Sequence, residues 1–372
     1  MTKALLVLAD GTSFQGQALG FSGSSIGEVI FNTSISGYQE ILTDPSYAQQ
    51  IVTLTYPHIG NVGINGSDYE SKTPYAKGLI VRDAPEHYHN WRGELSLHEW
   101  MIQQKVVGIS GVDTRALTNH LRTAGAQAGC IFHGDDEAQA LAQAQAFVGL
   151  ENTDLAKVVS CQSAYEWMDS TWALDGLTPT VGSGHHVVVM DFGVKQNMLR
   201  LLVERGCKVT VVPAMSTIES ILSLKPDGVL LSNGPGDPQP CTYAIETIQS
   251  LLERKVPMMG ICLGHQLLAL ACGANTEKMK CGHHGANHPV QDLATKRVMI
   301  TSQNHGFAVS DTDFPPQLKV THRSLFDVTI QGIAHQSAPA FSFQGHPEAN
   351  PGPQDAVGLF DQFMNMMQEA RS

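Results

Sequence analysis

The chain has 372 residues, of which 42% are apolar and 16% charged, so it is long enough for two domains and too apolar to be disordered. Its 35 acidic residues outnumber its 23 Lys and Arg residues, which gives a formal net charge of −12. An acidic surface repels phosphate groups, which argues against general nucleic-acid binding. The longest early apolar run, residues 4–9, is far too short for a signal peptide or a membrane span.

The seven cysteines are odd in number, widely spaced and free of any C-x-x-C pair. This pattern argues against a disulfide framework or a zinc site and favours a reducing cytoplasm. There each cysteine is either a small apolar filler, as we expect for Cys241, or a reactive thiol. A cluster of His283, His284 and His288 lies near Cys281, but no acidic residue at ligand spacing accompanies it, so we favour a hydrogen-bonding loop over a metal site.

The first half of the sequence predicts a separate α/β domain over residues 1–150. Its strands are expected at residues 3–8, 13–17, 28–33, 78–81 and 106–109, and its helices at residues 97–104, 114–123 and 137–147. This pattern does not fix the order of the strands. Residues 168–185 combine turn-forming residues with no apolar period, so we place a linker over residues 151–185.

In the second half, strands and helices alternate over a predicted domain of residues 186–372. Apolar strands are expected at residues 186–190, 208–212, 227–231 and 256–261, separated by helices at 195–204, 216–224 and 242–253. Continuous apolar strands between helices are typical of an open, mostly parallel sheet covered on both faces. More strands at 298–301, 318–321, 328–333 and 340–343 and an amphipathic helix at 354–369 complete the domain. Ligands of such folds bind beyond the carboxyl ends of the strands.

A cysteine follows the strand at 256–261 within the sequence GICLGHQ, residues 260–266. Strand, sharp G-x-C-x-G turn and helix together form the thiol version of the nucleophile elbow. The free N–H groups and the positive end of the helix favour a thiolate and can bind an oxyanion. We therefore predict that Cys262 is a nucleophile; the alternative is a structural cysteine buried after a buried strand.

A thiol nucleophile needs a base, and the base needs a group that orients it. The sequence FQGHPE, residues 343–348, follows a strand and places Glu348 where it can accept a hydrogen bond from one imidazole nitrogen of His346. Alone this motif is weak, but an elbow cysteine earlier in the chain makes it strong. The loop SNGPGDP, residues 232–238, also follows a strand and either presents backbone N–H donors at the same sheet edge or is an ordinary βα loop.

These three motifs resemble the signatures of class I (triad-type) glutamine amidotransferases. The stretch GYQEILTDPSYAQQIVTLTYPHIGNVG at residues 37–63 adds a more specific likeness. Together with SQNHGFAV at 302–309 and SFQGHPEANPGP at 342–353, it resembles the family of small, glutamine-hydrolysing subunits of carbamoyl-phosphate synthetases. The likeness covers nearly the whole chain and includes the order of the domains.

The resemblance implies a reaction with roles for individual residues. Cys262 would attack the side-chain amide of L-glutamine and form a glutamyl thioester, His346 would carry the proton to the leaving ammonia, and Glu348 would orient His346. The backbone N–H groups of Leu263 and Gly234 would form the oxyanion hole. The remaining glutamine-binding positions of the family fall on Ser46, Gly236, Gln266, Asn304, Gly306 and Phe307. Because Ser46 belongs to the first domain, the resemblance implies a site between the domains.

The sequence contains neither G-x-x-x-x-G-K-[ST] nor a convincing G-x-G-x-x-G loop, so we expect no cofactor and no metal in this chain. Carbamoyl phosphate synthesis needs ATP, so the resemblance implies a large partner subunit that carries ATP, Mg and K in a cytoplasmic heterodimer or higher oligomer. This chain would pass ammonia to that subunit through a closed channel, for arginine and pyrimidine synthesis. No nucleic-acid or membrane partner is expected.

Three positions depart from the family pattern: Cys281 replaces an aromatic residue, and Ala286 and Val328 each replace a glycine. They lie outside the triad motifs, and we expect Val328 to alter one turn. The tripeptide DFG at 191–193 lacks the other motifs of a kinase.

Two other functions remain open. One is a different amidotransferase or a stand-alone γ-glutamyl hydrolase, which has no need of a first domain of about 150 residues. The other is a non-catalytic regulatory subunit, against which the intact Cys262, His346 and Glu348 argue.

Overall fold

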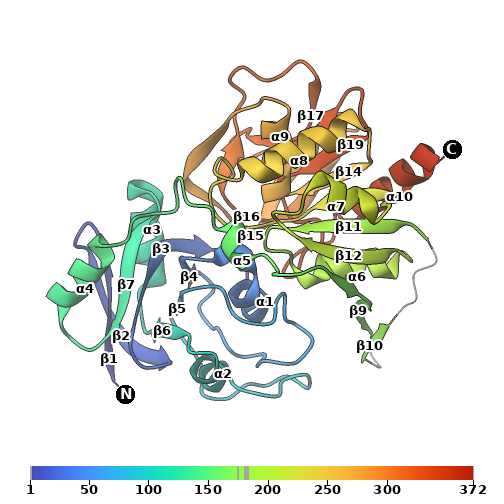
Figure 1. Ribbon diagram of the computed structural model, residues 1–372. Helices are drawn as coiled ribbons and strands as arrows, with labels where there is room; N and C mark the ends of the chain where they lie inside the picture. Colours follow the sequence, from blue (N-terminus) through green and yellow to red (C-terminus); the bar gives the residue numbers. More distant parts are fainter. Residues whose placement is uncertain (1, 174–175, 180–183, 372) are drawn as a thin grey trace. The chain divides into compact units, whose positions relative to one another are not determined.

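The computed structural model (Figure 1) describes residues 2–173, 176–179 and 184–371. It divides into two compact units, unit 1 with residues 1–151 and 280–285, and unit 2 with residues 152–279 and 286–372. The predicted α/β class with a separate N-terminal domain is confirmed. The segment 280–285 joins unit 1 although the sequence pattern placed it in the second domain, because it hydrogen-bonds to unit 1: Ala126 donates its N–H to Lys280 O.

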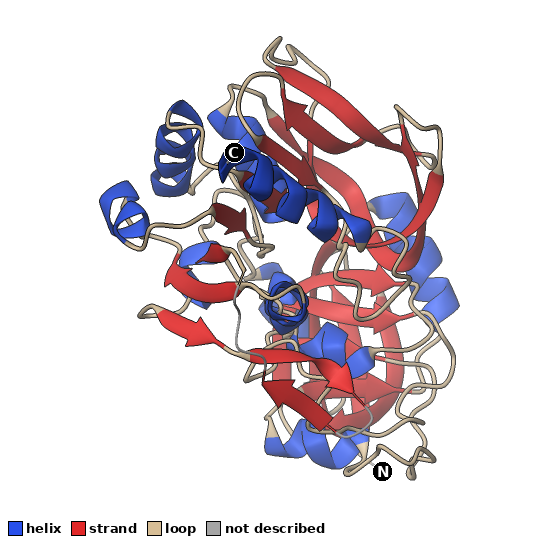
Figure 2. Ribbon diagram, turned by 90° about the vertical axis from the view of Figure 1, so that its right-hand side faces the viewer, coloured by secondary structure: helices blue, strands red, loops and turns tan. Residues whose placement is uncertain are grey.

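Unit 1 contains a closed barrel of seven strands in the order β1-β2-β6-β5-β4-β3-β7 among the residues described. Figure 2 shows the curved barrel strands in red, near the N-terminus. Pairing is parallel from β3 through β4 and β5 to β6, and antiparallel elsewhere. The strands are β1 (Lys3–Leu8), β2 (Ser13–Gly20), β3 (Ser24–Asn32), β4 (Gln50–Leu54), β5 (Gly78–Ile80), β6 (Val107–Ser110) and β7 (Gln127–His133).

The helices of unit 1 form where caps and apolar faces coincide. They are α1 (Tyr38–Thr43), a 3-10 helix (Pro45–Tyr47), α2 (Leu97–Gln103), α3 (Thr114–Ala124) and α4 (Glu137–Gln145). Helix α2 begins with a capping box in which Ser96 and Glu99 satisfy each other's backbone N–H groups. Leu117 and Leu121 of α3 pack into the same buried cluster as the barrel residue Ile131. The three helices expected from the sequence are confirmed, and α1 was not anticipated.

Unit 2 is built on a sheet of ten strands in the order β16-β15-β17-β18-β19-β14-β13-β11-β12-β8 within the described part of the chain. Parallel pairing is confined to the five strands from β19 to β12, and both flanks pair antiparallel. The strands are β8 (Tyr165–Trp167), β11 (His186–Asp191), β12 (Lys208–Pro213), β13 (Gly228–Leu231), β14 (Met258–Ile261), β15 (Thr276–Asp292), β16 (Val298–Val309), β17 (Leu318–Ser324), β18 (Ile330–His335) and β19 (Ala340–Phe343).

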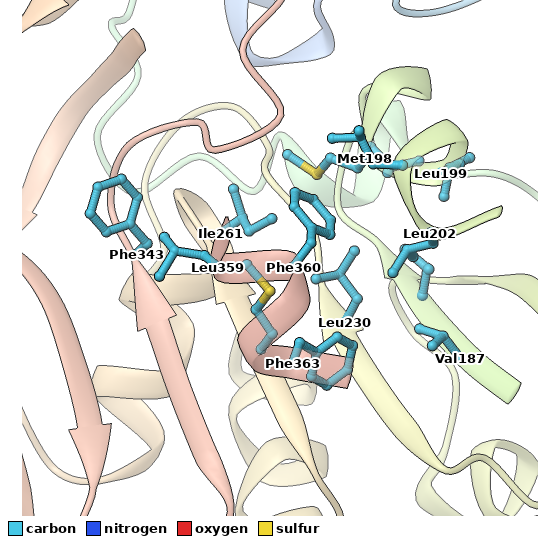
Figure 3. Packing of buried hydrophobic residues seen from close by; sticks show 14 of the residues in the cluster. Val187, Met198, Leu199, Leu202, Leu230, Ile261, Phe343, Leu359, Phe360 and Phe363 are labelled. Carbon is cyan, nitrogen blue, oxygen red and sulfur yellow. The ribbon is translucent and has the colours of Figure 1, made fainter. Parts of the chain in front are cut away.

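Helices cover both faces of the parallel strands, because successive residues of a strand point to opposite faces. On β11, Val187 belongs to one buried cluster and Val188 to another. Figure 3 shows Phe360 and Phe363 of α10 beside Val187 and Leu230 in the first cluster. The second cluster includes residues of α8 and α9. The helices of unit 2 are α5 (Ala156–Val159), α6 (Gln196–Glu204), α7 (Ile218–Ser223), α8 (Thr242–Glu253), α9 (Leu263–Ala271) and α10 (Gly358–Arg371).

The segment predicted as a linker, residues 151–185, carries ordered elements where it is described. Strand β8 extends the sheet by pairing antiparallel with β12, and β9 (Asp169–Ala173) pairs with β10 (Gly176–Pro179). Residues 174–175 and 180–183 of the expected linker lie outside the described residues. An edge strand of three residues with two exposed side chains shows no apolar period, so the sequence pattern could not reveal it.

No helix in residues 2–371, as far as they are described, is long and apolar enough to cross a lipid bilayer. The seven cysteines are free thiols. Among the described side chains, no group of three or more His, Cys, Asp or Glu residues is arranged to hold a metal ion.

Candidate active site

The elbow cysteine predicted from the sequence lies in a strained turn between β14 and α9. Cys262 has φ 53° and ψ −104°, a backbone conformation that non-glycine residues rarely adopt. Its N–H donates to Phe343 O at 3.0 Å, which ties the turn to the end of the neighbouring strand β19. The thiol is 2% exposed, and its sulfur lies 3.5 Å from Asn304 O. Strain held in place by neighbouring elements is typical of a functional residue.

Both glycines of G-x-C-x-G are required because a side chain at either position would clash with the backbone. A Cβ atom at Gly264 would lie 2.2 Å from Leu231 O on β13, and one at Gly260 would lie 2.6 Å from Gly264 O. Both oxygens belong to the backbone, so neither can move aside without shifting the sheet or the helix. Gly264 N–H also donates to Ser232 O at 3.0 Å. The elbow therefore packs directly against the end of β13, where the loop SNGPGDP begins.

The loop at residues 232–238 is held rigidly beside the elbow. Ser232 Oγ accepts a hydrogen bond from Phe192 N–H at 2.9 Å and donates to Asn233 O at 2.8 Å. A Cβ atom at Gly234 would lie 2.2 Å from Phe192 O and 2.7 Å from a methyl carbon of Leu263, so only glycine fits there. The first N–H groups of a helix have no acceptor within the helix, which leaves that of Leu263 in α9 able to bind an anion.

His346 and Glu348 form a buried pair on the turn that follows β19. His346 Nδ1 lies 2.6 Å from Glu348 Oε1, and each residue is 2% exposed. His346 N–H donates to Ser302 O at 2.9 Å, which fixes the turn against β16. Within the described structure, His346 Nε2 is buried without a hydrogen-bond partner. The ring therefore keeps one nitrogen for the carboxylate and one available for a reacting group.

The electrostatics of this pair favour the charged form of both groups. Burial lowers the pKa of His346, but the Glu348 carboxylate and then the Cys262 thiol act in the opposite direction, and the net shift of this pKa is upward. Burial raises the pKa of Glu348, but the Lys195 ammonium and then His346 reverse this, and the net shift is downward. An imidazolium at His346 is therefore stabilised mainly by the Glu348 carboxylate at 2.6 Å.

The other histidine beside the elbow is unsuited to act as a base. His265 is fully buried on α9, and its Nδ1 lies 2.8 Å from Ser342 Oγ. Burial, followed by the charge of His322, lowers the pKa of His265 to about 3. A ring that stays neutral in this way and bonds to a serine serves packing, which leaves His346 as the candidate base.

Four of the residues predicted to hold glutamine, Gln266, Asn304, Gly306 and Phe307, lie on α9 and β16. Gln266 Nε2 donates to Phe307 O at 2.8 Å and to Gln344 Oε1 at 3.1 Å, which links α9 to β16 and to the start of the GHPE turn. Asn304 and Phe307 are buried on β16. A Cβ atom at Gly306 would meet nothing within 4 Å, so the protein itself does not require glycine there. Gly236, at φ 80°, needs glycine for the turn of its loop.

Ser46 is the one predicted site residue that belongs to unit 1. It lies in the 3-10 helix, where its N–H donates to Asp44 Oδ1 at 2.8 Å. The other ten predicted residues belong to unit 2: Cys262, His346, Glu348, Gly234, Gly236, Leu263, Gln266, Asn304, Gly306 and Phe307. The role of Ser46 stays a prediction.

Two polar residues that the sequence pattern did not predict, Lys195 and Asn197, bind the turn that carries His346 and Glu348. Lys195 Nζ lies 2.9 Å from Glu348 Oε1 and donates to Ala349 O at 2.5 Å, and the Lys195 side chain is only 3% exposed. Asn197 Nδ2 donates to Glu348 O at 2.6 Å. Lys195 caps α6 and Asn197 lies in its first turn, shortly after β11, which pairs with β13, the strand that leads into the SNGPGDP loop. Their position shortly after a central strand of the parallel sheet was the feature of the sequence that could have indicated them.

Comparisons with known proteins agree with this arrangement. A family model described as "Glutamine amidotransferase class-I" matches residues 188–366, and one described as "Carbamoyl-phosphate synthase small chain, CPSase domain" matches residues 6–131. The carbamoyl phosphate synthase small chain of Vibrio cholerae is 58% identical over 100% of this chain and 99% of its own length. That of Pectobacterium atrosepticum is 57% identical over 100% and 98%, and that of Escherichia coli 56% identical over 99% and 98%.

Proposed function

Because this chain belongs to the family of carbamoyl phosphate synthase small chains and is a glutamine-hydrolysing enzyme with a class I glutamine amidotransferase domain, we propose that its reaction runs through Cys262, His346 and Glu348. The observation that carries this proposal is the buried pair of His346 and Glu348, in which Nδ1 and Oε1 lie 2.6 Å apart. The other imidazole nitrogen, Nε2, has no hydrogen-bond partner among the described residues, and Cys262 lies in a strained turn. A nucleophile, a base and a group that orients the base are the parts that covalent catalysis requires.

In the first half-reaction the Cys262 thiolate attacks the side-chain carbonyl carbon of L-glutamine. The oxyanion that forms accepts hydrogen bonds from the N–H groups of Leu263 and Gly234. The C–N bond breaks when the imidazolium of His346 donates its Nε2 proton to the leaving nitrogen, which departs as ammonia. A glutamyl thioester on Cys262 and a neutral imidazole remain.

In the second half-reaction water attacks the thioester. His346 Nε2 accepts a proton from the water, the C–S bond breaks, and glutamate leaves with the thiolate–imidazolium pair restored. Glu348 holds Nδ1–H throughout, so that Nε2 faces the reacting atoms. The substrate is held by Gln266, Gly236, Asn304, Gly306 and Phe307, and by Ser46 from unit 1.

We also propose that the ammonia serves a partner polypeptide. The relatives are named small chains, which supports a large subunit that uses ATP with Mg and K to make carbamoyl phosphate from bicarbonate, for arginine and pyrimidine synthesis. Free ammonia is protonated in water and loses its nucleophilicity, so transfer through a closed channel in a heterodimer or higher oligomer preserves it. This chain itself is proposed to hold no cofactor.

The test uses the chain assembled with its large subunit. Cys262→Ser is expected to abolish glutamate release and glutamine-dependent carbamoyl phosphate synthesis, while synthesis from added ammonia continues. Cys281→Ser is the matched control, because the Cys281 thiol lies outside the proposed triad, with its sulfur 3.6 Å from Leu121 O and 3.8 Å from Arg122 O. Glutamine-dependent synthesis by Cys262→Ser, or no glutamate release by the wild type, would contradict the proposal.

A further inference from the structure

Gln344 is a fully buried polar residue to which the proposed reaction gives no role. It follows β19 directly and precedes His346 by two positions, in the turn that carries the triad pair. Its N–H donates to Gln331 O at 2.8 Å, and its side-chain oxygen Oε1 accepts a hydrogen bond from Gln266 Nε2 at 3.1 Å. A buried amide group therefore links the triad turn to α9, the helix that begins at the elbow.

The orientation of the Gln266 amide follows from its two acceptors. Phe307 O, which lies 2.8 Å from Gln266 Nε2, is a backbone carbonyl oxygen and can only accept, so the amide nitrogen must face it. Gln344 Oε1 accepts the second hydrogen of the same nitrogen. Since a side-chain amide nitrogen carries two hydrogens, only the carbonyl oxygen of Gln266 remains for a ligand. The group of L-glutamine that suits such an acceptor best is its α-ammonium, a charged donor.

Packing alone does not explain an amide at position 344. Within the described structure, Gln344 Nε2 is buried without a hydrogen-bond partner. An unpaired amide nitrogen in the core is destabilising, and an apolar side chain of similar size would fill the same space without it. Gln331 differs, because its Nε2 donates to Thr329 Oγ1 at 3.3 Å and its Oε1 accepts from Gln303 Nε2 at 2.9 Å. The oxygen of Gln344 is thus the part of its side chain that has a partner, and that partner is Gln266.

We propose that Gln344 is a positioning residue for glutamine binding, which holds the Gln266 amide so that Gln266 Oε1 is presented to the α-ammonium group of the substrate. This inference rests on the proposed function, in which Gln266 binds L-glutamine. Without the Gln344 oxygen, one N–H of Gln266 has lost its acceptor in the core, and the amide is no longer fixed on both sides. A contact with the α-ammonium group is the same before and during reaction at the side-chain amide, so its loss weakens substrate binding and leaves the chemical step unchanged.

The test measures glutamate release by the chain assembled with its large subunit, over a range of L-glutamine concentrations. Gln344→Met keeps the length of the side chain and removes its acceptor. We expect its KM for glutamine to rise about tenfold, with kcat within about twofold of the wild type. Gln331→Met is the matched control, because Gln331 is equally buried and its side chain bonds to Gln303 and Thr329 rather than to a proposed glutamine-binding residue. Its KM should equal that of the wild type.

A double-mutant cycle shows whether Gln344 acts through Gln266. On a Gln266→Met background, Gln344→Met should raise the KM no further. An unchanged KM in Gln344→Met, an equal rise in Gln331→Met, a further rise on the Gln266→Met background, or a fall in kcat larger than the rise in KM would overturn the proposal. If Gln344→Met does not fold, Gln344→Asn decides, because it keeps an amide in the core and withdraws the oxygen by one methylene group. Its KM should rise as well, and a wild-type KM in this variant contradicts the proposal.

Failure of this inference can be distinguished from failure of the proposed function. His346→Asn tests the triad without changing Gln344 or Gln266. Glutamate release that survives His346→Asn would refute the triad itself. If His346→Asn loses glutamate release while Gln344→Met keeps the wild-type KM, only the role of Gln344 is refuted.

Discussion

Replacement of Gly264 by alanine tests whether the elbow is as tightly packed as the structure shows. The added Cβ would lie 2.2 Å from Leu231 O, 2.6 Å from Leu231 C and 2.7 Å from Leu231 Cβ. All three atoms are part of β13 in the middle of the parallel sheet, so α9 or β13 must shift. Overpacking typically costs 1–3 kcal/mol, and contacts with the backbone of a central strand place Gly264→Ala at about 3 kcal/mol.

The assay for Gly264→Ala is urea unfolding followed by circular dichroism, with Gly358→Ala as the matched control. A Cβ atom at Gly358 would meet nothing within 4 Å, and the residue begins α10. Alanine there should be neutral or stabilise the chain by up to about 1 kcal/mol. If the unfolding free energies of the two variants differ by less than about 0.5 kcal/mol, the packing argument for the G-x-C-x-G turn is refuted.

Three further changes probe a turn, the substrate pocket and the charged pair. Val328 has φ 59° on an exposed turn, so Val328→Gly should stabilise the chain by about 0.5–1 kcal/mol and raise its thermal midpoint, and a lowered midpoint would count against strain at this turn. Gly306→Ala meets no protein atom within 4 Å, so it should leave the thermal midpoint unchanged but raise the KM for glutamine; an unchanged KM would remove Gly306 from the pocket. The pKa of His346 lies above its usual 6.5, so the folded chain keeps a proton that the unfolded chain loses, and stability from this group falls as pH rises above 6.5. The decline in unfolding free energy from pH 7 to 9 should be smaller in His346→Asn than in the wild type, and equal slopes would contradict a stabilised imidazolium.

The sequence pattern anticipated unit 2 well because its parallel strands are buried on both faces. Runs such as residues 187–190 and 229–231 are continuously apolar, and turn residues end them sharply. The triad also follows from the sequence, because Cys262 and the GHPE turn each come directly after such a strand. Parallel strands bring their carboxyl ends to one edge, so motifs far apart in the chain meet without further information.

The barrel of unit 1 could not be predicted in the same way. Strand β7 (Gln127–His133) contains glycine and small residues and shows little apolar alternation, yet it closes the barrel by pairing with both β1 and β3. In the sheet of unit 2, strand β15 (Thr276–Asp292) likewise shows no apolar alternation and pairs antiparallel with β17. Such strands depend on long-range pairing, which local propensity does not encode.

The burial of the Lys195 side chain likewise could not be predicted from the local sequence. In the sequence it is an ordinary lysine shortly before a helix, where exposure is the usual outcome. It is buried because Asn233 and Glu348, 38 and 153 positions later, offer an acceptor and an anion. Contacts of this kind are recognised only when distant segments are placed together.

We propose that hydrolysis passes through a covalent bond to the sulfur of Cys262. The direct measurement is mass spectrometry of the wild-type chain and its large subunit, mixed with L-glutamine and quenched in acid during turnover. We predict a glutamyl group on the peptide that contains Cys262, absent from Cys262→Ser. Continued release of glutamate with no acyl group on Cys262, or with the group on another residue, would contradict the account.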